Sequence, residues 1–448
     1  MSDRVLASRR VLWDGQLIRG AVTVRGGIIT AVEPGPAPQR SLDLGHDVLM
    51  AGLVDTHVHV NEPGRTDWEG FRSATLAAAA GGITTLVDMP LNTTPVTTTV
   101  QALHTKIAAT DGQLFVDMAF WGGVVPGNAA ELVPMVTAGA RGFKAFLCPS
   151  GIDDFPAVTE AHLREVMPIL RGAGVPLLVH AELEGELSSV ASDADPRAYA
   201  TYLHSRPKEL EDRAVALIVG LVRETGCRAH IVHLSSATAL DIVRAAKAEG
   251  LPLTAETCPH YLCLRAEEIP DGATAYKCAP PIREDANRDA LWAALADGTL
   301  DFVVTDHSPC TPALKRLDSG SFTDAWGGIA SLQLGLRAVW TEAHRRGIGQ
   351  TILGKWMAVG PAALAGFPDR GNLKVGARAD LLRWRPESGG VVDSASLLHK
   401  HPTTPYAGLH LDGEIVDVWL AGDRIVENGA PLGRPRGRPL LHPRGTRG

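Results

Sequence analysis

The sequence lacks the features of secreted, membrane-spanning and nucleic-acid-binding proteins. Its six cysteines form no CxxC pair and no dense cluster, which excludes a disulfide scaffold and predicts reduced thiols. No apolar run reaches about 18 residues, so no membrane span is expected. The net charge of -7 gives no sign of affinity for nucleic acid or membrane surfaces. The N-terminal MSDRVLASRRVLWDG has no apolar signal core, so we expect a cytoplasmic protein.

The hydrophobic pattern instead predicts an α/β enzyme fold in two domains. The 448 residues, 45% of them hydrophobic, are enough for one large barrel and a smaller domain. Apolar runs alternate with helical stretches in the middle of the chain, which predicts a parallel (β/α)8 TIM-like barrel over residues 51–369. Strand signals with glycine turns at both ends predict a small β-sandwich domain built from residues 1–50 and 370–448. There is no internal repeat.

Two local signals refine this picture. Thr66 and Glu69 are spaced as a capping box, and Gly81 with Gly82 follows the alanine run, so a helix is expected between them. The tail from 433 to 448 holds five arginines with glycine and proline and little that could build a core. We expect it to be disordered or to lie on a neighbouring subunit. A nucleic-acid arm is disfavoured because the body of the protein is acidic.

Several apolar runs end in residues that can bind metal ions. Gly52-Leu53-Val54-Asp55-Thr56-His57-Val58-His59 ends in two histidines that a strand places on one face, about 6 to 7 Å apart. This pair alone is equally consistent with two packed or solvated histidines. However, Lys144 lies inside an apolar run, where an unpaired ammonium is costly to bury, and three further runs end in His180, His233 and Asp306. The recurrence predicts a two-metal hydrolase site at one end of the barrel.

The same segments resemble the amidohydrolase superfamily, in its cyclic amidase branch of dihydroorotases, hydantoinases and allantoinases, and within that branch they resemble allantoinases most. The matching strings cover most of the chain from about residue 50 to 330. They are DTHVHVNEPGRTDWEGF from residue 55, AAAAGGITTLVDMPLNTTP from 77, GFKAFLCPSGIDDFP from 142, HAE from 180, HIVHLSSA from 230, ETCPHYL from 256, KCAPPIR from 277 and VTDHSPC from 304.

The resemblance implies a binuclear metal site. His57 and His59 would hold one divalent ion with Asp306, His180 and His233 would hold the other, and Lys144, carboxylated on its side-chain nitrogen, would bridge both. Zinc is expected, although four histidines, a carboxylate and a carbamate also accept cobalt, manganese or iron. The resemblance also implies a homo-oligomer, specifically a homotetramer.

The chemistry of these residue types explains their use. A lysine in an apolar strand has a lowered pKa, so its neutral amine can capture carbon dioxide and become a bridging carbamate. Two cations about 3.5 to 4 Å apart make a hydroxide available at neutral pH and polarise an amide carbonyl. Asp306 would act as general base and then as general acid, passing the proton to the leaving nitrogen. The implied reaction opens the hydantoin ring of allantoin, a small neutral molecule, to give allantoate in purine nitrogen recycling.

Three other functions are possible for a chain with these residues. A non-catalytic scaffold is disfavoured because all six ligand positions are filled. A dihydroorotase resembles this chain but carries an arginine two residues after the second histidine, where Asn61 stands here. A hydantoinase or dihydropyrimidinase acting on other cyclic ureides is the remaining alternative, but such enzymes usually carry a tyrosine shortly after the lysine, and here Lys144 is followed by Ala-Phe-Leu-Cys-Pro-Ser-Gly. The candidate substrate-binding residues are Asn61, Asn92, Cys278 and Ser308.

Three further histidines and two cysteines lie in or near the matching strings, and their roles are less specific. His230 has the opposite strand parity to His233 and is expected to pack outward. His260 and His307 lie beside the expected site, where they either support its ligands or simply pack. Cys148 and Cys278 either line the substrate pocket or act as small buried hydrophobic residues.

Overall fold

Apolar runs that are buried on both faces form parallel strands, and here they build a barrel. The protein is represented by a computed structural model that describes residues 3–185 and 193–441. The barrel strands follow the chain in order, with β8 and β9 separated only by Trp121. They are β6 (Leu53–Val58), β7 (Ile83–Asp88), β8 (Asp117–Phe120), β9 (Gly122–Gly123), β10 (Phe143–Phe146), β11 (Leu177–His180), β12 (Ala229–Ile231), β13 (Leu253–Thr257) and β14 (Phe302–Val303).

Parallel pairing joins these strands into a closed ring. One sheet has the order β6-β7-β8 and the other the order β9-β10-β11-β12-β13-β14. The ring closes where β6 meets the segment after β14, because Val58 forms a parallel bridge with His307 and the His59 amide donates to the His307 carbonyl at 2.8 Å. Counting β8 and β9 as one strand, the structure confirms the predicted eight-stranded parallel barrel.

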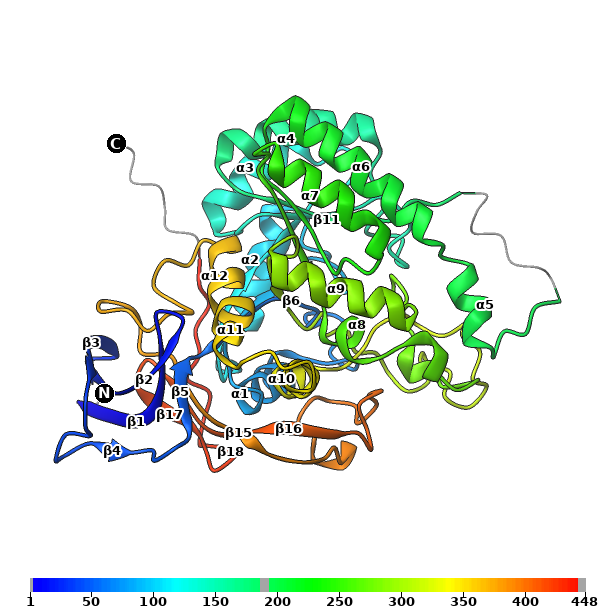
Figure 1. The fold of residues 1–448 in the computed structure, drawn as a ribbon. Coiled ribbons are helices and arrows are strands. Elements are labelled where there is room, and N and C mark those ends of the chain that lie inside the picture. The colour runs from blue at the N-terminus through cyan, green and yellow to red at the C-terminus, as the bar shows by residue number, and fades with distance from the viewer. Residues whose placement is uncertain (1–2, 186–192, 442–448) are drawn as a thin grey trace.

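Helices between successive strands cover the barrel from outside (Figure 1). They are α1 (Phe71–Ala80), α2 (Val100–Ala109), α3 (Ala129–Ala138), α4 (Glu160–Ala173), α5 (Tyr199–His204), α6 (Lys208–Thr225), α7 (Leu240–Ala248), α8 (Pro259–Cys263), α9 (Asp285–Asp297), α10 (Gly335–Arg345), α11 (Thr351–Gly354) and α12 (Gly360–Leu364). A π-helical segment, Lys355–Val359, joins α11 to α12. Short 3-10 turns occur at Ala237–Ala239, Ala266–Glu268, Thr274–Tyr276 and Ser394–Ser396.

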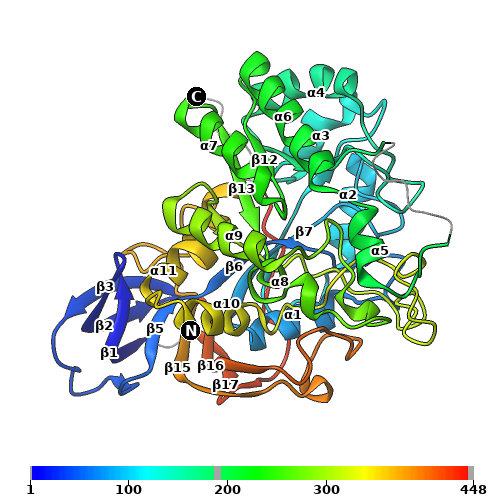
Figure 2. The same ribbon diagram turned by 45° about the vertical axis from the view of Figure 1, so that its right-hand side comes forward.

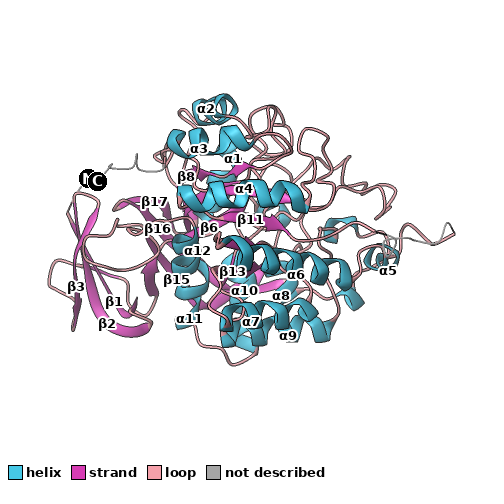
Figure 3. Cartoon of the chain, turned by 90° about the horizontal axis from the view of Figure 1, so that it is seen from above, coloured by secondary structure: helices cyan, strands magenta, loops and turns pink. Residues whose placement is uncertain are grey.

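Both ends of the chain build a β-rich domain beside the barrel, as predicted (Figure 3). Nine strands form one hydrogen-bonded sheet of order β18-β17-β16-β15-β5-β1-β2-β3, with β4 paired to β1. Antiparallel pairing of β15 with β5 joins the two ends of the chain. The strands are β1 (Arg4–Trp13), β2 (Gln16–Arg25), β3 (Ile28–Pro34), β4 (Leu42–Asp43), β5 (Val48–Ala51), β15 (Leu381–Val391), β16 (His410–Leu420), β17 (Asp423–Glu427) and β18 (Ala430–Pro431). The predicted domain boundary between residues 50 and 51 falls within β5, just before its last residue, Ala51.

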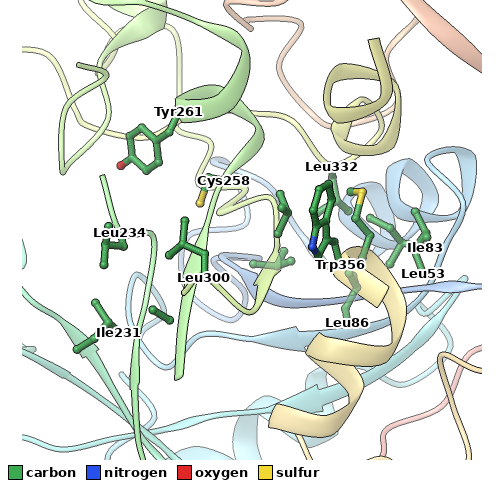
Figure 4. Close-up of a cluster of buried hydrophobic side chains, with 14 of the residues drawn as sticks. Leu53, Ile83, Leu86, Ile231, Leu234, Cys258, Tyr261, Leu300, Leu332 and Trp356 are labelled. Carbon is green, nitrogen blue, oxygen red and sulfur yellow. The ribbon is translucent and has the colours of Figure 1, made fainter. Parts of the chain in front are cut away.

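The core runs continuously from the barrel into this sheet. Helix α10 packs on β16, and α1 lies between β7 and the C-terminal strands (Figure 2). The small side chains of α1 allow this close approach, since Ala74 and Ala77 to Ala79 are completely buried. Figure 4 shows part of the same core, a cluster of buried hydrophobic side chains that includes Leu86, Leu332 and Trp356. Among the described residues, no helix has both the length and the apolar character needed to cross a membrane.

The predicted capping box is wrong. Helix α1 begins after Gly70 with no side-chain cap, and the Phe71 amide instead donates to Glu62 Oε2 at 2.8 Å. Glu69 is fully buried and lies 3.3 Å from His307 Nε2, so tertiary contacts replace the local cap. The end of the helix at Gly81 is as predicted: a Cβ there would lie 2.5 Å from the Leu332 carbonyl.

The described part of the C-terminal tail also differs from the prediction, because it lies on its own barrel. Pro439 forms a parallel bridge with Met118 of β8, and the Leu440 amide donates to the Met118 carbonyl at 2.6 Å. The Arg438 amide donates to Asp117 Oδ1 at 2.9 Å. Hydrogen bonds to β8 thus hold the tail on the barrel, although the tail has few hydrophobic residues. Residues 442–448 lie outside the described part of the chain.

Candidate metal centre

The six predicted metal-binding side chains converge at the carboxyl ends of the barrel strands. All are at most 6% exposed, and all line one cavity of about 250 Å³. They come from β6, β10 and β11 and from the turns that follow β6, β12 and β14. They are His57, His59, Lys144, His180, His233 and Asp306.

The first group of ligands surrounds one carboxylate oxygen. His57 Nε2 lies 3.2 Å and His59 Nε2 lies 3.6 Å from Asp306 Oδ1. The ligand atoms of these three residues lie within 4.8 Å of one another. Asp306 has a left-handed backbone, with φ of 45°, which turns the chain at the end of its strand. The geometry can hold one divalent ion.

The second group of ligands lies directly beside the first. His180 Nδ1 is 3.0 Å from His233 Nε2, and the rings of His57 and His233 are 5.2 Å apart. The ring of Phe146 stacks on His180 with a centroid separation of 4.6 Å, which fixes the orientation of the imidazole. Two histidine nitrogens at this distance can share a second cation.

Lys144 lines the same cavity as both groups. Its side chain is completely buried, and its Nζ atom has no hydrogen-bond partner among the described residues. Burial lowers the pKa of Lys144 to about 8, although the nearby Asp306 and Glu256 oppose this shift. Its charge in turn lowers the pKa of each of the four histidines. A buried amine without a partner is the expected precursor of a carbamate ligand.

The histidines are neutral at physiological pH. Burial lowers the pKa of His57 and of His180 to about 4, and it also lowers the pKa of His59 and of His233 well below the ordinary value. A neutral imidazole has a free nitrogen lone pair, which metal binding requires. The electrostatics of the cavity therefore prepare these side chains to bind cations.

Glu256 of β13 is a functional residue that the sequence analysis missed. Its Oε1 atom lies 2.5 Å from His57 Nδ1, and its Oε2 atom lies 2.9 Å from His230 Nε2. A carboxylate behind a metal-binding histidine fixes the ring and its tautomer, so that His57 presents Nε2 to the cavity. The available signal was weaker than for Lys144, because Glu256 lies in Leu253-Thr254-Ala255-Glu256-Thr257, where two threonines interrupt the apolar pattern.

The prediction that His230 packs outward is wrong. His230 is completely buried, bonds Glu256 and stacks on Phe302. Strand β12 ends at Ile231, and His233 lies beyond it with φ of 38°, so strand parity does not relate the two histidines. Both side chains are therefore connected to the metal-binding cluster.

Glu182 was also missed and supports His180. Glu182 Oε2 lies 3.1 Å from His180 Nε2, so Nδ1 of that ring faces the cavity. Arg206 donates two hydrogen bonds to the carboxylate, at 2.9 and 2.5 Å. Interactions with Arg206 and His180 lower the pKa of Glu182 even though burial opposes them. Cys148, which is buried, lies within the same group.

Two buried carboxylates hold the strand end that carries Asp306. Asp55 accepts hydrogen bonds from the His57 and Thr305 amides, each at 3.0 Å, and so ties β6 to the end of β14. His307 Nδ1 accepts a hydrogen bond from the Ser331 amide, which directs Nε2 toward Glu69. His307 thus supports the site, whereas neither ring nitrogen of His260 has a hydrogen-bond partner among the described residues.

The structure brings only two of the four predicted substrate-binding residues to the cavity. Asn92 and Ser308 line it. Asn61 does not, because its side chain is fully buried and donates to the Pro309 carbonyl at 3.2 Å. Cys278 also lies behind the wall, and its carbonyl accepts a hydrogen bond from Tyr202 at 2.6 Å. Unpredicted residues complete the lining, among them Phe146, Tyr202, Arg206, Lys277 and Trp326.

Comparison with known proteins gives consistent results. Residues 48–425 match the Amidohydrolase family. The chain is 50% identical to an allantoinase from Streptomyces avermitilis over 98% of this chain and 99% of that protein. It is 44% identical to an allantoinase from Arabidopsis thaliana, covering 95% and 88% of the two chains. Among solved structures, it is similar to L-hydantoinase (dihydropyrimidinase) from Arthrobacter aurescens, with a TM-score of 0.91, 29% identity and coverage of 98% and 100%.

Proposed function

The chain belongs to the amidohydrolase family, and from this premise we propose that it is a metal-dependent cyclic amidase that hydrolyses the hydantoin ring of allantoin to allantoate. The near full-length similarity to allantoinases carries this proposal. The cavity supports it, because a volume of about 250 Å³ suits a small ring rather than a polymer.

The residues present fit two divalent metal ions. His57, His59 and Asp306 would hold one ion, and His180 and His233 would hold the other. Lys144, once carboxylated, would bridge both. His57 Nε2 and Lys144 Nζ are buried without hydrogen-bond partners, which is costly unless a ligand completes their coordination. Nitrogen and oxygen donors of this kind suit zinc, and cobalt, manganese or iron are also compatible.

The ions would acidify a water molecule and polarise the amide carbonyl of the substrate. Asp306 is the general base of this proposal: a carboxylate oxygen takes a proton from the attacking water and later delivers it to the ring nitrogen as the C–N bond breaks. Glu256 and Glu182 keep the imidazoles of His57 and His180 in the required orientation.

The remaining proposals concern substrate contacts and assembly. Asn92 and Ser308 are in position to hydrogen-bond a small amide substrate, since both line the cavity. Asn61 and Cys278 would act only indirectly, through the Pro309 and Tyr202 contacts described above. We also propose a homotetramer, on the family resemblance alone, which a mass measurement in solution would test.

A substrate panel tests the proposed function. Metal-loaded enzyme should be assayed with allantoin, hydantoin, dihydrouracil and dihydroorotate. We expect the highest kcat/KM for allantoin. The alternative, a hydantoinase or dihydropyrimidinase, is favoured by the structural similarity to the Arthrobacter aurescens enzyme. A preference for hydantoin or dihydrouracil would establish that alternative and reject allantoin as the main substrate.

A further inference from the structure

Lys277 brings a buried positive charge to the substrate cavity. The residue is 9% exposed and lines the cavity with Tyr202, Arg206 and Trp326. Its Nζ atom donates to the carbonyls of Ala325 at 2.6 Å and Thr323 at 3.3 Å. Within residues 3–185 and 193–441, it forms no ion pair with a carboxylate. The Nζ atom also lies 4.9 Å from the centroid of the Tyr202 ring. An ammonium has three donors, so the third is left for this ring or for a ligand in the cavity.

The surrounding structure holds Lys277 firmly. The carbonyl of Lys277 accepts hydrogen bonds from the Gly328 amide at 2.8 Å and from Lys315 Nζ at 2.9 Å. Lys315 also donates to the Trp326 carbonyl at 3.0 Å. Gly328 has φ of 148° and lies so close to the Ser308 carbonyl that a Cβ would be 2.1 Å from it. A second buried ammonium and a tight backbone contact thus fix the wall that carries Lys277.

The charge of Lys277 is poorly compensated. Arg206 is matched by Glu182, whereas the one carboxylate of the described residues that raises the pKa of Lys277 is the exposed Asp324, which forms no ion pair with it. Burial, and then the like charges of Lys315 and Arg206, lower the pKa of Lys277 to about 8. Most Lys277 side chains are therefore in the charged ammonium form at neutral pH.

Lys277 and Asp306 line the same cavity. Asp306 belongs to the metal-binding group with His57 and His59, whereas Lys277 is hydrogen-bonded to the wall segment that contains Ala325 and Gly328. A substrate whose ring amide lies beside Asp306 therefore has its ring substituent in the same cavity as the Lys277 ammonium.

We propose that Lys277 is a specificity-determining residue that donates a hydrogen bond to the carbonyl oxygen on the arm of a cyclic ureide substrate. This inference rests on the proposed function and extends it. Allantoin carries a ureido arm whose carbonyl is a strong acceptor, whereas hydantoin is the same ring without the arm. A hydrogen bond from a charged donor is stronger than one between neutral groups. Lys277 therefore favours allantoin over hydantoin.

The test compares the two ligands in matched variants of the metal-loaded enzyme. Lys277→Met removes the charge and keeps the chain length, and Lys374→Met makes the same change at an exposed position. We expect Lys277→Met to reduce the preference for allantoin over hydantoin by about ten- to a hundredfold, chiefly through KM for allantoin. Lys374→Met should keep the wild-type preference. Metal content and the unfolding temperature report whether each variant is folded.

The inference fails if folded, metal-loaded Lys277→Met loses affinity equally for both ligands, or retains the wild-type preference. Dissociation constants measured by calorimetry in the Asp306→Asn background separate binding from turnover. If the wild-type enzyme does not hydrolyse allantoin, the proposed function fails, but these constants still test Lys277. A selective loss for allantoin would then support the residue as a binding determinant, and equal losses would reject it.

Discussion

At the scale of single residues, buried charges inside the barrel strands mark the site. Lys144 and Glu256 are the charged residues of strands β10 and β13, and both are completely buried. Burial of an unpaired charge is expensive, so each has a function that depends on its protonation state or its partner. Lys144 Nζ has no hydrogen-bond partner within the described residues, whereas Glu256 has two histidines. This difference separates a metal ligand from a residue that positions one.

Lys144→Ala should remove most of the bound metal and most of the activity, because the carbamate is the only protein ligand proposed to contact both ions. A short-chain carboxylic acid such as propionate should partly restore turnover, since its two oxygens can replace those of the carbamate. Metal analysis and rate measurements with and without propionate check this. Full metal content and a near-normal rate in the variant alone would contradict the bridging role.

Asp306→Asn should affect catalysis more than metal binding. The other five ligands remain, so metal loss should be partial, while kcat should fall by about 10² to 10⁴ because proton transfer is lost. Steady-state rates and metal content of the same preparation give the comparison. Wild-type kcat with both ions bound would rule out Asp306 as the general base.

Glu256→Gln should weaken metal binding about 10- to 100-fold, because an amide holds the His57 tautomer less strongly than a carboxylate does. Competition with a chelator of known affinity measures the change. Glu249→Gln is a suitable control, since Glu249 lies on the surface and pairs only with Arg223 in the described structure. Equal metal affinities for the two variants would show that Glu256 has no positioning role.

At the scale of elements, the turns that follow the strands decide where side chains point. His233 and Asp306 both lie just beyond a strand, with φ of 38° and 45°. Such conformations are uncommon for these residue types and persist where the surrounding contacts impose them. The tail provides a further example, because residues 437–440 lie along β8 through backbone hydrogen bonds that hydrophobic patterning does not reveal.

Truncation after Gly433 should therefore destabilise the barrel. It removes the hydrogen bonds that Met118, Asp117 and Leu114 make with the tail, and the loss should be about 2 to 4 kcal/mol at roughly 1 kcal/mol for each bond. Chemical denaturation measures it. Removal of residues 442–448 alone provides the reference. Identical free energies of unfolding for the two truncated proteins would show that the tail contacts contribute nothing.

At the scale of the whole molecule, the site depends on barrel closure. Its ligands come from five strands or the turns after them, and Asp55 ties the first strand to the last. The family predicted from the sequence strings is confirmed by the match over residues 48–425. Because the proposed ions would bind where these strands meet, metal binding and the folded barrel should stabilise each other.

Removal of the metal should lower the unfolding temperature and abolish turnover. At about a hundred times the dissociation constant, bound metal contributes about 3 kcal/mol. Reactivation should require carbon dioxide. At equal dissolved carbon dioxide it should be faster at about pH 8.5 than at about pH 6.5. The reason is that the neutral amine of Lys144 becomes more abundant as the pH rises through its pKa of about 8. Reactivation that is independent of carbon dioxide would argue against a carbamate.

The sequence by itself determined the barrel, the β-rich domain built from both chain ends and the six residues at the strand ends. The barrel follows from apolar runs that alternate with helical stretches, and the β-rich domain follows from strand signals with glycine turns. The six residues follow from apolar runs that contain or end in a ligand-capable side chain. Only the tertiary structure decided what those side chains meet. His57 contacts Glu256 from 199 residues away, His230 turns inward, Asn61 and Cys278 lie behind the cavity wall, and Lys277 lines it. Periodicity assigns a residue to a face of its own element, whereas the packing of distant elements determines which faces share a cavity.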